Sequence, residues 1–238
     1  MVYMSQPKGF EDATHPNYVC HLHKALYGLK QAPRQWYNTF TYYLLSLGFI
    51  HSNSDPSLFL FHKNNIHLYL LIYVDDILFT GNSTKTMAKI LEQLNLKFSM
   101  KLLGLAHNFL GIQIQRNSNG YFLSQKQYAS SILDTAELSN CNSVQNPLCT
   151  KPPADLPLDT ALTDPTFYRK LIGSLQYLTL TRPDIAFSVN LLSQHMHDPS
   201  PQHAFLLKRL LRYIKGTLNF GLPIAKSNLQ LTSFSDAD

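Results

Sequence analysis

The chain has 238 residues, with 20 Lys and Arg against 15 Asp and Glu and a formal net charge of +5. A hydrophobic content of 45% is enough for a folded core and excludes general disorder. The longest apolar run, 68–74, is too short to cross a bilayer, and the start lacks the pattern of a secretory signal. We therefore expect a soluble intracellular protein, cytoplasmic or nuclear, with no membrane partner. The mild positive charge permits a polyanionic partner.

Cysteine usage supports this expectation. Cys20, Cys141 and Cys149 are too few for a disulfide framework, and their odd number favours a reducing compartment. The segment 20–23, Cys-His-Leu-His, has no second half with metal-ligand spacing. A structural metal site is therefore not expected there.

The first predicted helix covers 33–47, after an opening segment, 1–16, without a clear period. Pro33 suits the first helical turn, and Gly48 suits the residue after the last turn. The apolar residues of the helix follow a helical period and predict one buried stripe. They are Trp36, Phe40, Tyr43, Leu44 and Leu47.

Two apolar strands, 66–74 and 77–81, then flank the acidic pair Asp75 and Asp76. Their β-branched and aromatic residues predict a hairpin with the two carboxylates at its turn. Adjacent carboxylates repel each other unless a cation lies between them, and Mg²⁺ is held by one or two carboxylates plus substrate phosphates. The alternative is an ordinary turn, in which Asp is common.

The next segment is predicted to contain a helix, two strands and another helix. Ser83 or Thr84 would cap the first helix, and Ser124 with Gln127 would form a capping box for the second, which ends near Glu137. The strands are 109–115 and 121–123, joined by a turn at 117–120. The first helix would point four apolar residues inward: Met87, Ile90, Leu91 and Leu94.

Basic residues outnumber acidic ones between Asp76 and Asp134, where Glu92 is the single acid. They could grip phosphates beside the acidic pair, or they could be solvated helix faces. The sequence leaves both interpretations open. The six bases are Lys85, Lys89, Lys97, Lys101, Arg116 and Lys126.

Prolines cluster in 139–165, which predicts a linker or a long surface crossing. Three helices follow, opened by Pro165, Pro183 and Pro201, and the last ends at Gly216. That last helix has an apolar face and a basic face, which could lie along a nucleic-acid backbone or be a solvated face. The apolar face has Leu207, Leu210, Leu211 and Ile214, and the basic face has Lys208, Arg212 and Lys215. The end, 231–238, has strand-like composition.

Several segments resemble one family in the family's order. Residues 73–76, Tyr-Val-Asp-Asp, match the metal-binding hairpin of reverse transcriptases. Residues 26–37 resemble the template- and nucleotide-contacting loop and helix of Ty1/copia-type retrotransposon polymerases, and 100–112 resembles their primer-holding region. The chain thus resembles a piece of a Ty1/copia-type Pol polyprotein. The post-palm helices and the first strand of RNase H are matched by 168–178, 182–187, 207–218 and 235–238.

The resemblance implies an α+β fold. It would be a reverse-transcriptase palm, an antiparallel sheet with helices on one face, followed by a mostly helical connecting region. We expect the palm and thumb-side portion in 1–138 and a Pro-rich linker in 139–165. The helical connecting region would cover 166–226, and the first strand of a truncated RNase H domain would cover 227–238.

The resemblance also implies an RNA-directed DNA polymerase that uses an RNA/DNA primer-template and dNTPs. Its chemistry needs two Mg²⁺ (or Mn²⁺) ions about 4 Å apart. Asp75 would hold both metals, Asp76 would support the site, and Tyr73 would lie near the primer end. Asp236 would be a remnant of the RNase H acidic cluster.

Residues before and within the first predicted helix match the loop with which the family contacts its template and nucleotide. By this resemblance, Lys30, Gln31 and Arg34 would face the template or the incoming nucleotide. Gly28 and Pro33 would shape the loop. Substrate binding is thus expected from two separate segments, this loop and the acidic hairpin.

One departure concerns the metal ligands. The family's site also uses an aspartate upstream of the segment matched by 2–7, where this chain begins, and neither Glu11 nor Asp12 can replace it. Leu102 and Leu105 also stand where family members usually carry acids. We therefore expect the chain to be inactive or nearly so alone, because metals carry most of the charge stabilisation.

Two alternatives remain open beside the inactive polymerase fragment. The chain could be a non-catalytic remnant that binds nucleic acid, with the rest of the Pol polyprotein as a further partner. It could also be a translated remnant without a partner, with an exposed sheet edge that promotes aggregation.

Overall fold

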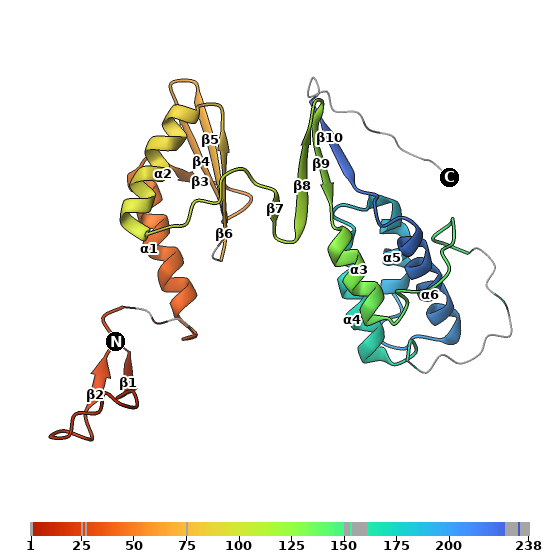
Figure 1. The fold of residues 1–238 in the computed structure, drawn as a ribbon, viewed down its shortest axis with the longest axis horizontal. Coiled ribbons are helices and arrows are strands. Elements are labelled where there is room, and N and C mark those ends of the chain that lie inside the picture. Colours follow the sequence, from red (N-terminus) through yellow and green to blue (C-terminus); the bar gives the residue numbers. More distant parts are fainter. Residues whose placement is uncertain are drawn as a thin grey trace. The chain divides into compact units, whose positions relative to one another are not determined.

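The computed structural model describes residues 2–24, 26, 28–74, 76–149, 153, 161–226 and 233. The chain forms two compact units, unit 1 (Met1–Leu103) and unit 2 (Gly104–Asp238) (Figure 1). Each unit combines helices with antiparallel strands, which confirms the predicted α+β class.

Unit 1 contains a four-stranded antiparallel sheet in the order β3-β4-β5-β6. A separate two-stranded hairpin, β1-β2, precedes it. The predicted helix and acidic hairpin are both present, whereas β1 to β4 were not predicted. The elements are β1 (Tyr3–Ser5), β2 (Val19–His21), α1 (Ala32–Ser46), β3 (Ile50–His51), β4 (Leu58–Lys63), β5 (Ile66–Tyr73), β6 (Asp76–Gly81) and α2 (Thr84–Phe98).

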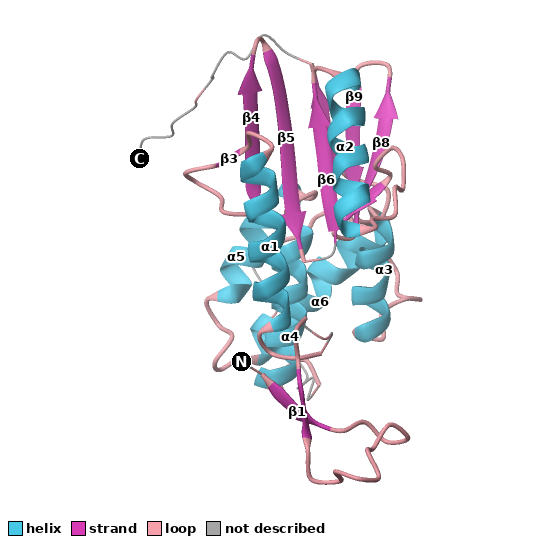
Figure 2. Cartoon of the chain, turned by 90° about the vertical axis from the view of Figure 1, so that its left-hand side faces the viewer, coloured by secondary structure: helices cyan, strands magenta, loops and turns pink. Residues whose placement is uncertain are grey.

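Both helices of unit 1 cover the same face of its sheet (Figure 2). Side chains alternate along β5, so that Leu68, Leu70 and Ile72 are buried while the intervening residues point the other way. These three residues form one core cluster with residues of both helices, such as Phe40 of α1 and Leu94 of α2. The expected antiparallel sheet with helices on one face is therefore present.

Local signals set the ends of these helices as predicted. Pro33 lies in the first turn of α1, and Gly48 follows the helix with a left-handed φ of +94°. Ser83 is the N-cap of α2, and its Oγ accepts a hydrogen bond from the Thr86 amide at 3.3 Å. The apolar stripe of α1 faces the core, with Phe40 and Leu44 fully buried.

Unit 2 joins a four-stranded antiparallel sheet, in the order β10-β9-β8-β7, to a group of helices. Strand β10 lies in the region expected to be mostly helical and pairs with β9, far earlier in the chain. The elements are β7 (Asn108–Phe109), β8 (Ile112–Asn117), β9 (Gly120–Ser124), α3 (Lys126–Thr135), α4 (Pro165–Leu178), η1 (Pro183–Ile185), α5 (Ala186–Ser193), α6 (Pro201–Gly216) and β10 (Leu222–Ala225).

Two local predictions in unit 2 are wrong. The single strand 109–115 is a hairpin, because Leu110 and Gly111 take φ values of +53° and +76° and reverse the chain. The Tyr177 hydroxyl donates to the Leu110 carbonyl and holds this turn. Ser124 is not a helix cap, since it ends β9 and its hydroxyl donates to Gln113 Oε1 at 3.4 Å.

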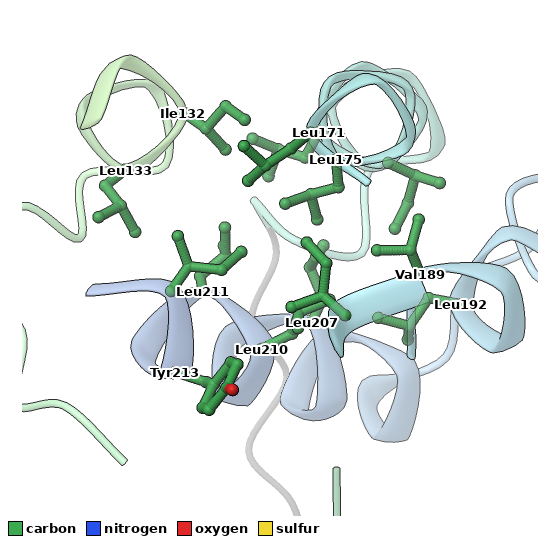
Figure 3. Close-up of a cluster of buried hydrophobic side chains, with 14 of the residues drawn as sticks. Ile132, Leu133, Leu171, Leu175, Val189, Leu192, Leu207, Leu210, Leu211 and Tyr213 are labelled. Carbon is green, nitrogen blue, oxygen red and sulfur yellow. The ribbon is translucent and has the colours of Figure 1, made fainter. Parts of the chain in front are cut away.

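The three predicted proline-opened helices are confirmed. Asp164 caps α4 by accepting from the Phe167 amide at 2.8 Å, and Pro183 opens the short η1 that leads into α5. Ser200 caps α6. Apolar residues of these helices interdigitate with those of α3 in a single core (Figure 3). It includes Ile132, Leu133, Leu171, Leu175, Val189, Leu192, Leu207, Leu210 and Leu211.

The described part of the Pro-rich segment, 139–149, crosses the surface of α6. The Val144 amide donates to the Arg212 carbonyl at 3.4 Å, and Arg212 Nε donates to the Asn142 carbonyl at 2.7 Å. Arg209 Nε donates to the Leu148 carbonyl at 3.2 Å. Arg209 and Arg212 of α6 thus hold the described part of this segment against the helix.

Arg182 is the main buried charge of unit 2, with 2% of its surface exposed. Its guanidinium donates two hydrogen bonds to Asp184, at 2.9 and 2.8 Å, and two to Thr217, at 3.0 and 2.7 Å. The Tyr213 hydroxyl donates to Asp184 at 2.9 Å. Burial would raise the pKa of Asp184, but hydrogen bonds and charge from Arg182, with the Tyr213 bond, hold this pKa below its ordinary value. The network joins η1 to the end of α6.

The predicted domain boundaries rest on composition and family resemblance, and they stay predictions. The compact units divide between Leu103 and Gly104, and α3 packs in the core of unit 2. No disulfide links Cys20, Cys141 and Cys149. Among the described helices, none combines the length and apolar character needed to cross a membrane.

We expect Arg182→Lys to destabilise unit 2 by about 3 kcal/mol, because lysine cannot reproduce the forked hydrogen bonds that the guanidinium donates to Asp184 and Thr217. Urea unfolding followed by helical circular dichroism measures this change. Trp36, the single tryptophan, lies in unit 1, so its fluorescence transition should not move. Arg116→Lys, at an exposed site of unit 2, is the matched control. Equal transitions for both variants would contradict the role of Arg182.

The N-terminus of α6 should be sensitive to acid through His203. Its Nδ1 accepts from the Ser200 amide at 3.0 Å, which requires an unprotonated nitrogen, and its ring stacks on His195 at a centroid distance of 3.7 Å. Burial and the neighbouring His195 lower the pKa of His203, although Asp198 opposes this. The unfolded chain therefore binds this proton more readily than the native chain.

We expect unit 2 to lose about 1 kcal/mol of stability as the pH falls below the ordinary histidine pKa of 6.5. Protonation of His203 Nδ1 breaks its hydrogen bond with the Ser200 amide, which is one half of the capping box that Ser200 and His203 form at the start of α6. His203→Gln keeps an acceptor at this position and removes the titration. The difference between wild type and this variant, followed by circular dichroism in urea, should grow as the pH falls. A constant difference would exclude His203 as the titrating group.

Candidate functional site

The acidic hairpin lies at the end of β5 and β6. Tyr73 pairs with Asp76, so the turn between them contains only Val74 and position 75. Tyr73 and Val74 are 56% and 65% exposed, and Asp76 is exposed at the first position of β6. Asp75 lies outside the described residues. The structure therefore presents Tyr73 and Asp76 at one exposed sheet end.

Val74 has a left-handed backbone, with φ of +55°. A β-branched residue with positive φ is a conformational outlier, and such strain persists only where surrounding structure imposes it. Here the paired strands on both sides of the turn impose it. Strained residues cluster at functional sites, which makes this turn a candidate independently of its acids.

The predicted substrate loop leads into α1. Gly28 has φ of +92°, a conformation that favours glycine. Gln31 is the N-cap residue of α1, although its side chain makes no capping hydrogen bond. Lys30, Pro33 and Arg34 are exposed. The predicted loop residues thus gather at the start of one helix.

The loop and the acidic hairpin lie toward the same end of the sheet of unit 1. Tyr37, in the second turn of α1, donates its hydroxyl to the Pro56 carbonyl at 2.6 Å. The adjacent Ser57 carbonyl accepts from the Ile72 amide at 2.9 Å, next to Tyr73. Figures 1 and 2 show the start of α1 toward the end where the β5–β6 turn lies. The segment 56–57 therefore connects the two predicted substrate-binding segments.

Among the described residues, the acidic hairpin offers one carboxylate, that of Asp76. Among them, no group of three or more His, Cys, Asp or Glu side chains could hold a metal ion. Asp12 lies in a turn, where its carboxylate accepts hydrogen bonds from the Thr14 hydroxyl and amide at 2.5 and 2.8 Å. These hydrogen bonds lower the pKa of Asp12. Asp76 supplies a carboxylate of the type that Mg²⁺ prefers, and Mg²⁺ completes its shell with substrate phosphates and water. The donor chemistry fits Mg²⁺ at the hairpin.

The six bases after Asp76 are divided between the two units. Lys85, Lys89 and Lys97 lie on α2 in unit 1, whereas Arg116 and Lys126 lie in unit 2. Lys97 places its ammonium 5.9 Å from the ring centre of Tyr43, as in a cation–π contact. Both interpretations of the six bases stay predictions.

A small polar pocket adjoins the substrate loop and was missed in the sequence. It has a volume of about 110 Å³. His23 and Lys24 line it with Gln31 and Gln35, over Val2, Leu22 and Leu29. In the sequence, the sign of this pocket is a set of four polar residues, two before the loop and two at the start of α1. Only the chain reversal between β1 and β2, which brings Val2 beside Leu22, shows that they share a pocket.

The remaining predicted features are Asp236, the strand-like end of the chain, and the pair Leu102 and Leu105. Asp236 lies outside the described residues, as does the strand-like end 231–238 apart from Ser233. Leu102 and Leu105, at the positions where acids were expected, are 57% and 74% exposed. Neither observation adds a metal ligand to the site.

Comparison with known proteins places these features in one family. Residues 1–150 match the family model described as reverse transcriptase (RNA-dependent DNA polymerase). Over 238 residues the chain is 49% identical to the retrovirus-related Pol polyprotein from transposon RE1 of Arabidopsis thaliana. It is 37% identical over 252 residues to the corresponding polyprotein from transposon TNT 1-94 of Nicotiana tabacum. A putative transposon Ty5-1 protein of Saccharomyces cerevisiae is 34% identical over 239 residues.

Coverage differs between these relatives. The whole chain aligns with the RE1 and TNT 1-94 polyproteins but spans only 16% and 19% of their lengths. In the Ty5-1 comparison, 99% of the chain covers 78% of the relative. No solved structure matches the chain.

We expect Val74→Gly to stabilise unit 1 by about 1 kcal/mol or less, because glycine adopts the left-handed backbone without a Cβ clash. Since Val74 is exposed, little apolar burial is lost. Urea unfolding followed by Trp36 fluorescence reports this unit. Val74→Ala keeps the Cβ and is the matched control. A glycine variant less stable than the alanine variant would show that the turn is unstrained.

Proposed function

Because this chain belongs to the reverse transcriptase family of Ty1/copia-type retrotransposon Pol polyproteins, we propose that it forms the palm and primer-holding part of an RNA-directed DNA polymerase. The observation that supports this most is the Tyr-Val-Asp-Asp hairpin at the end of a sheet that two helices cover on one face. A packed scaffold of this kind can hold a metal site rigidly.

In the proposed site, Asp75 and Asp76 hold Mg²⁺ or Mn²⁺. When bound, these ions stabilise the attacking and leaving oxygens of an in-line displacement at phosphorus. Tyr73, exposed beside Asp76, positions the primer end. Asp75 remains the main metal ligand of this proposal, with Asp76 in support.

The loop before α1 supplies the substrate contacts of the proposal. Lys30 and Arg34 are exposed cations that can donate hydrogen bonds to phosphates of the template or the incoming nucleotide. Gln31 can hydrogen-bond either substrate, while Gly28 and Pro33 fix the backbone of the loop. The partners are thus an RNA/DNA primer-template, dNTPs and the rest of the Pol polyprotein.

Catalysis by the chain alone should be weak. Within the described residues, no third carboxylate joins Asp76, and two metal ions need more anionic ligands than an aspartate pair provides. We propose that the third aspartate of the family's site comes from the segment upstream of the one matched by 2–7. The RNase H assignment of Asp236 remains a prediction of the same resemblance.

A second candidate is a nucleic-acid-binding protein without catalysis. The net charge of +5, the pI near 9.0 and the exposed Lys30 and Arg34 favour it. Binding through these cations needs no metal. A polymerase should lose primer extension when Asp75 is substituted, whereas a non-catalytic binding protein should keep its nucleic-acid binding. An Asp75 substitution therefore separates the two candidates.

Primer extension on an RNA template, with Mg²⁺ or Mn²⁺, tests the proposal. We expect weak extension by the chain and a loss of at least about 100-fold in Asp75→Asn, because metal binding is impaired. Asp12→Asn, in a surface turn, should extend like wild type. Metal-free binding of primer-template should be unchanged in both variants.

The outcomes separate the candidates. Extension that survives Asp75→Asn would contradict the assigned site. Intact binding without any extension would favour the non-catalytic candidate. Aggregation of the purified chain before either assay would instead support the remnant with an exposed sheet edge.

A further inference from the structure

The pocket beside the substrate loop has a composition suited to one kind of ligand. Its walls come from the end of the β1–β2 hairpin and from the start of α1. The Leu22 amide donates to the Val2 carbonyl at 2.9 Å, and the Ala32 amide donates to the Leu29 carbonyl at 3.0 Å. Backbone hydrogen bonds therefore fix both walls. We call this cavity the hairpin pocket.

The polar groups of the hairpin pocket are mostly donors. Lys24 supplies an ammonium group, and Gln31 and Gln35 supply amide N–H groups. His23 adds an imidazole, and no Asp or Glu is among the residues that line the pocket. Lys24 takes part in neither of the ion pairs found among the described residues. A pocket with a cation and without a carboxylate favours an anionic ligand rich in acceptors.

The volume limits what this anion can be. At about 110 Å³, the pocket has room for one phosphate group, while the sugar and base of a nucleotide would lie outside it. Leu22 and Leu29 are apolar, which leaves the polar residues of the lining as the phosphate contacts.

We propose that the hairpin pocket binds a single phosphate group through Lys24, with Gln31, Gln35 and His23 as hydrogen-bonding partners. The inference rests on the proposed polymerase function, which supplies two sources of phosphate, the nucleic-acid backbone and the triphosphate of the incoming nucleotide. Lys24 is thereby an additional positioning residue, before the loop that carries Lys30 and Arg34.

Lys24→Ala tests this proposal, with Lys8→Ala as the matched control. Lys8 is also exposed, lies between β1 and β2, and does not line the pocket. Primer-template binding is measured by fluorescence anisotropy over a series of salt concentrations. Binding of dTTP to the complex with primer-template and Mg²⁺ is measured by calorimetry. Lys24→Arg should rescue whichever property is lost, since it restores a cation.

If the phosphate belongs to the nucleic-acid backbone, Lys24→Ala should reduce the slope of log affinity against log salt concentration by about 1. If it belongs to the nucleotide, this slope should stay constant and dTTP binding should weaken by about tenfold. Either result supports the proposal and identifies the source.

A Lys24→Ala variant that matches Lys8→Ala in both assays overturns the proposal and leaves the polymerase function standing. A wild-type chain that binds neither primer-template nor dTTP overturns the proposed function, and the phosphate pocket with it. Because Lys24 is exposed, its variants should melt like wild type, which circular dichroism checks.

Discussion

The alternation of apolar side chains along β5 is the constraint on which the candidate site depends. Leu68, Leu70 and Ile72 must face the two helices, and a slip of one residue would turn all three toward solvent. This fixes the register in which Tyr73 meets Asp76. The acidic turn is thus held by core packing that lies behind it, although the turn itself is exposed.

Unit 2 depends on a different kind of interaction. Its apolar core joins helices through contacts that many side chains can make, whereas the Arg182 network needs particular donors and acceptors on η1 and α6. Such buried ionic contacts contribute little net stability compared with apolar packing, but they penalise alternative arrangements strongly. We infer that apolar burial stabilises the helices of unit 2, and that the Arg182 network fixes how η1 meets the end of α6.

The sequence predicted those features whose signals are local. Pro33, Ser83 and Pro201 mark helix ends through backbone geometry that neighbouring residues decide. Ser124 gave the same kind of signal and misled, because a residue on the adjacent strand competes for its hydroxyl. Leu110 gave no signal, since leucine rarely adopts a left-handed backbone. In the site, the motif located Asp76, but Lys24 needed the distant Val2 to form a pocket.

The pairing of β10 with β9 has a consequence for synthesis. Gly120 meets Ala225, so the edge of β9 has no partner until the helices between them have been made. At translation rates of about 5–20 residues per second, that delay is roughly 5 to 20 seconds. Unit 1 can fold on the ribosome during this time, while β9 of the nascent unit 2 has one unpaired edge. Chaperone demand should therefore be greatest while the residues between β9 and β10 are being made.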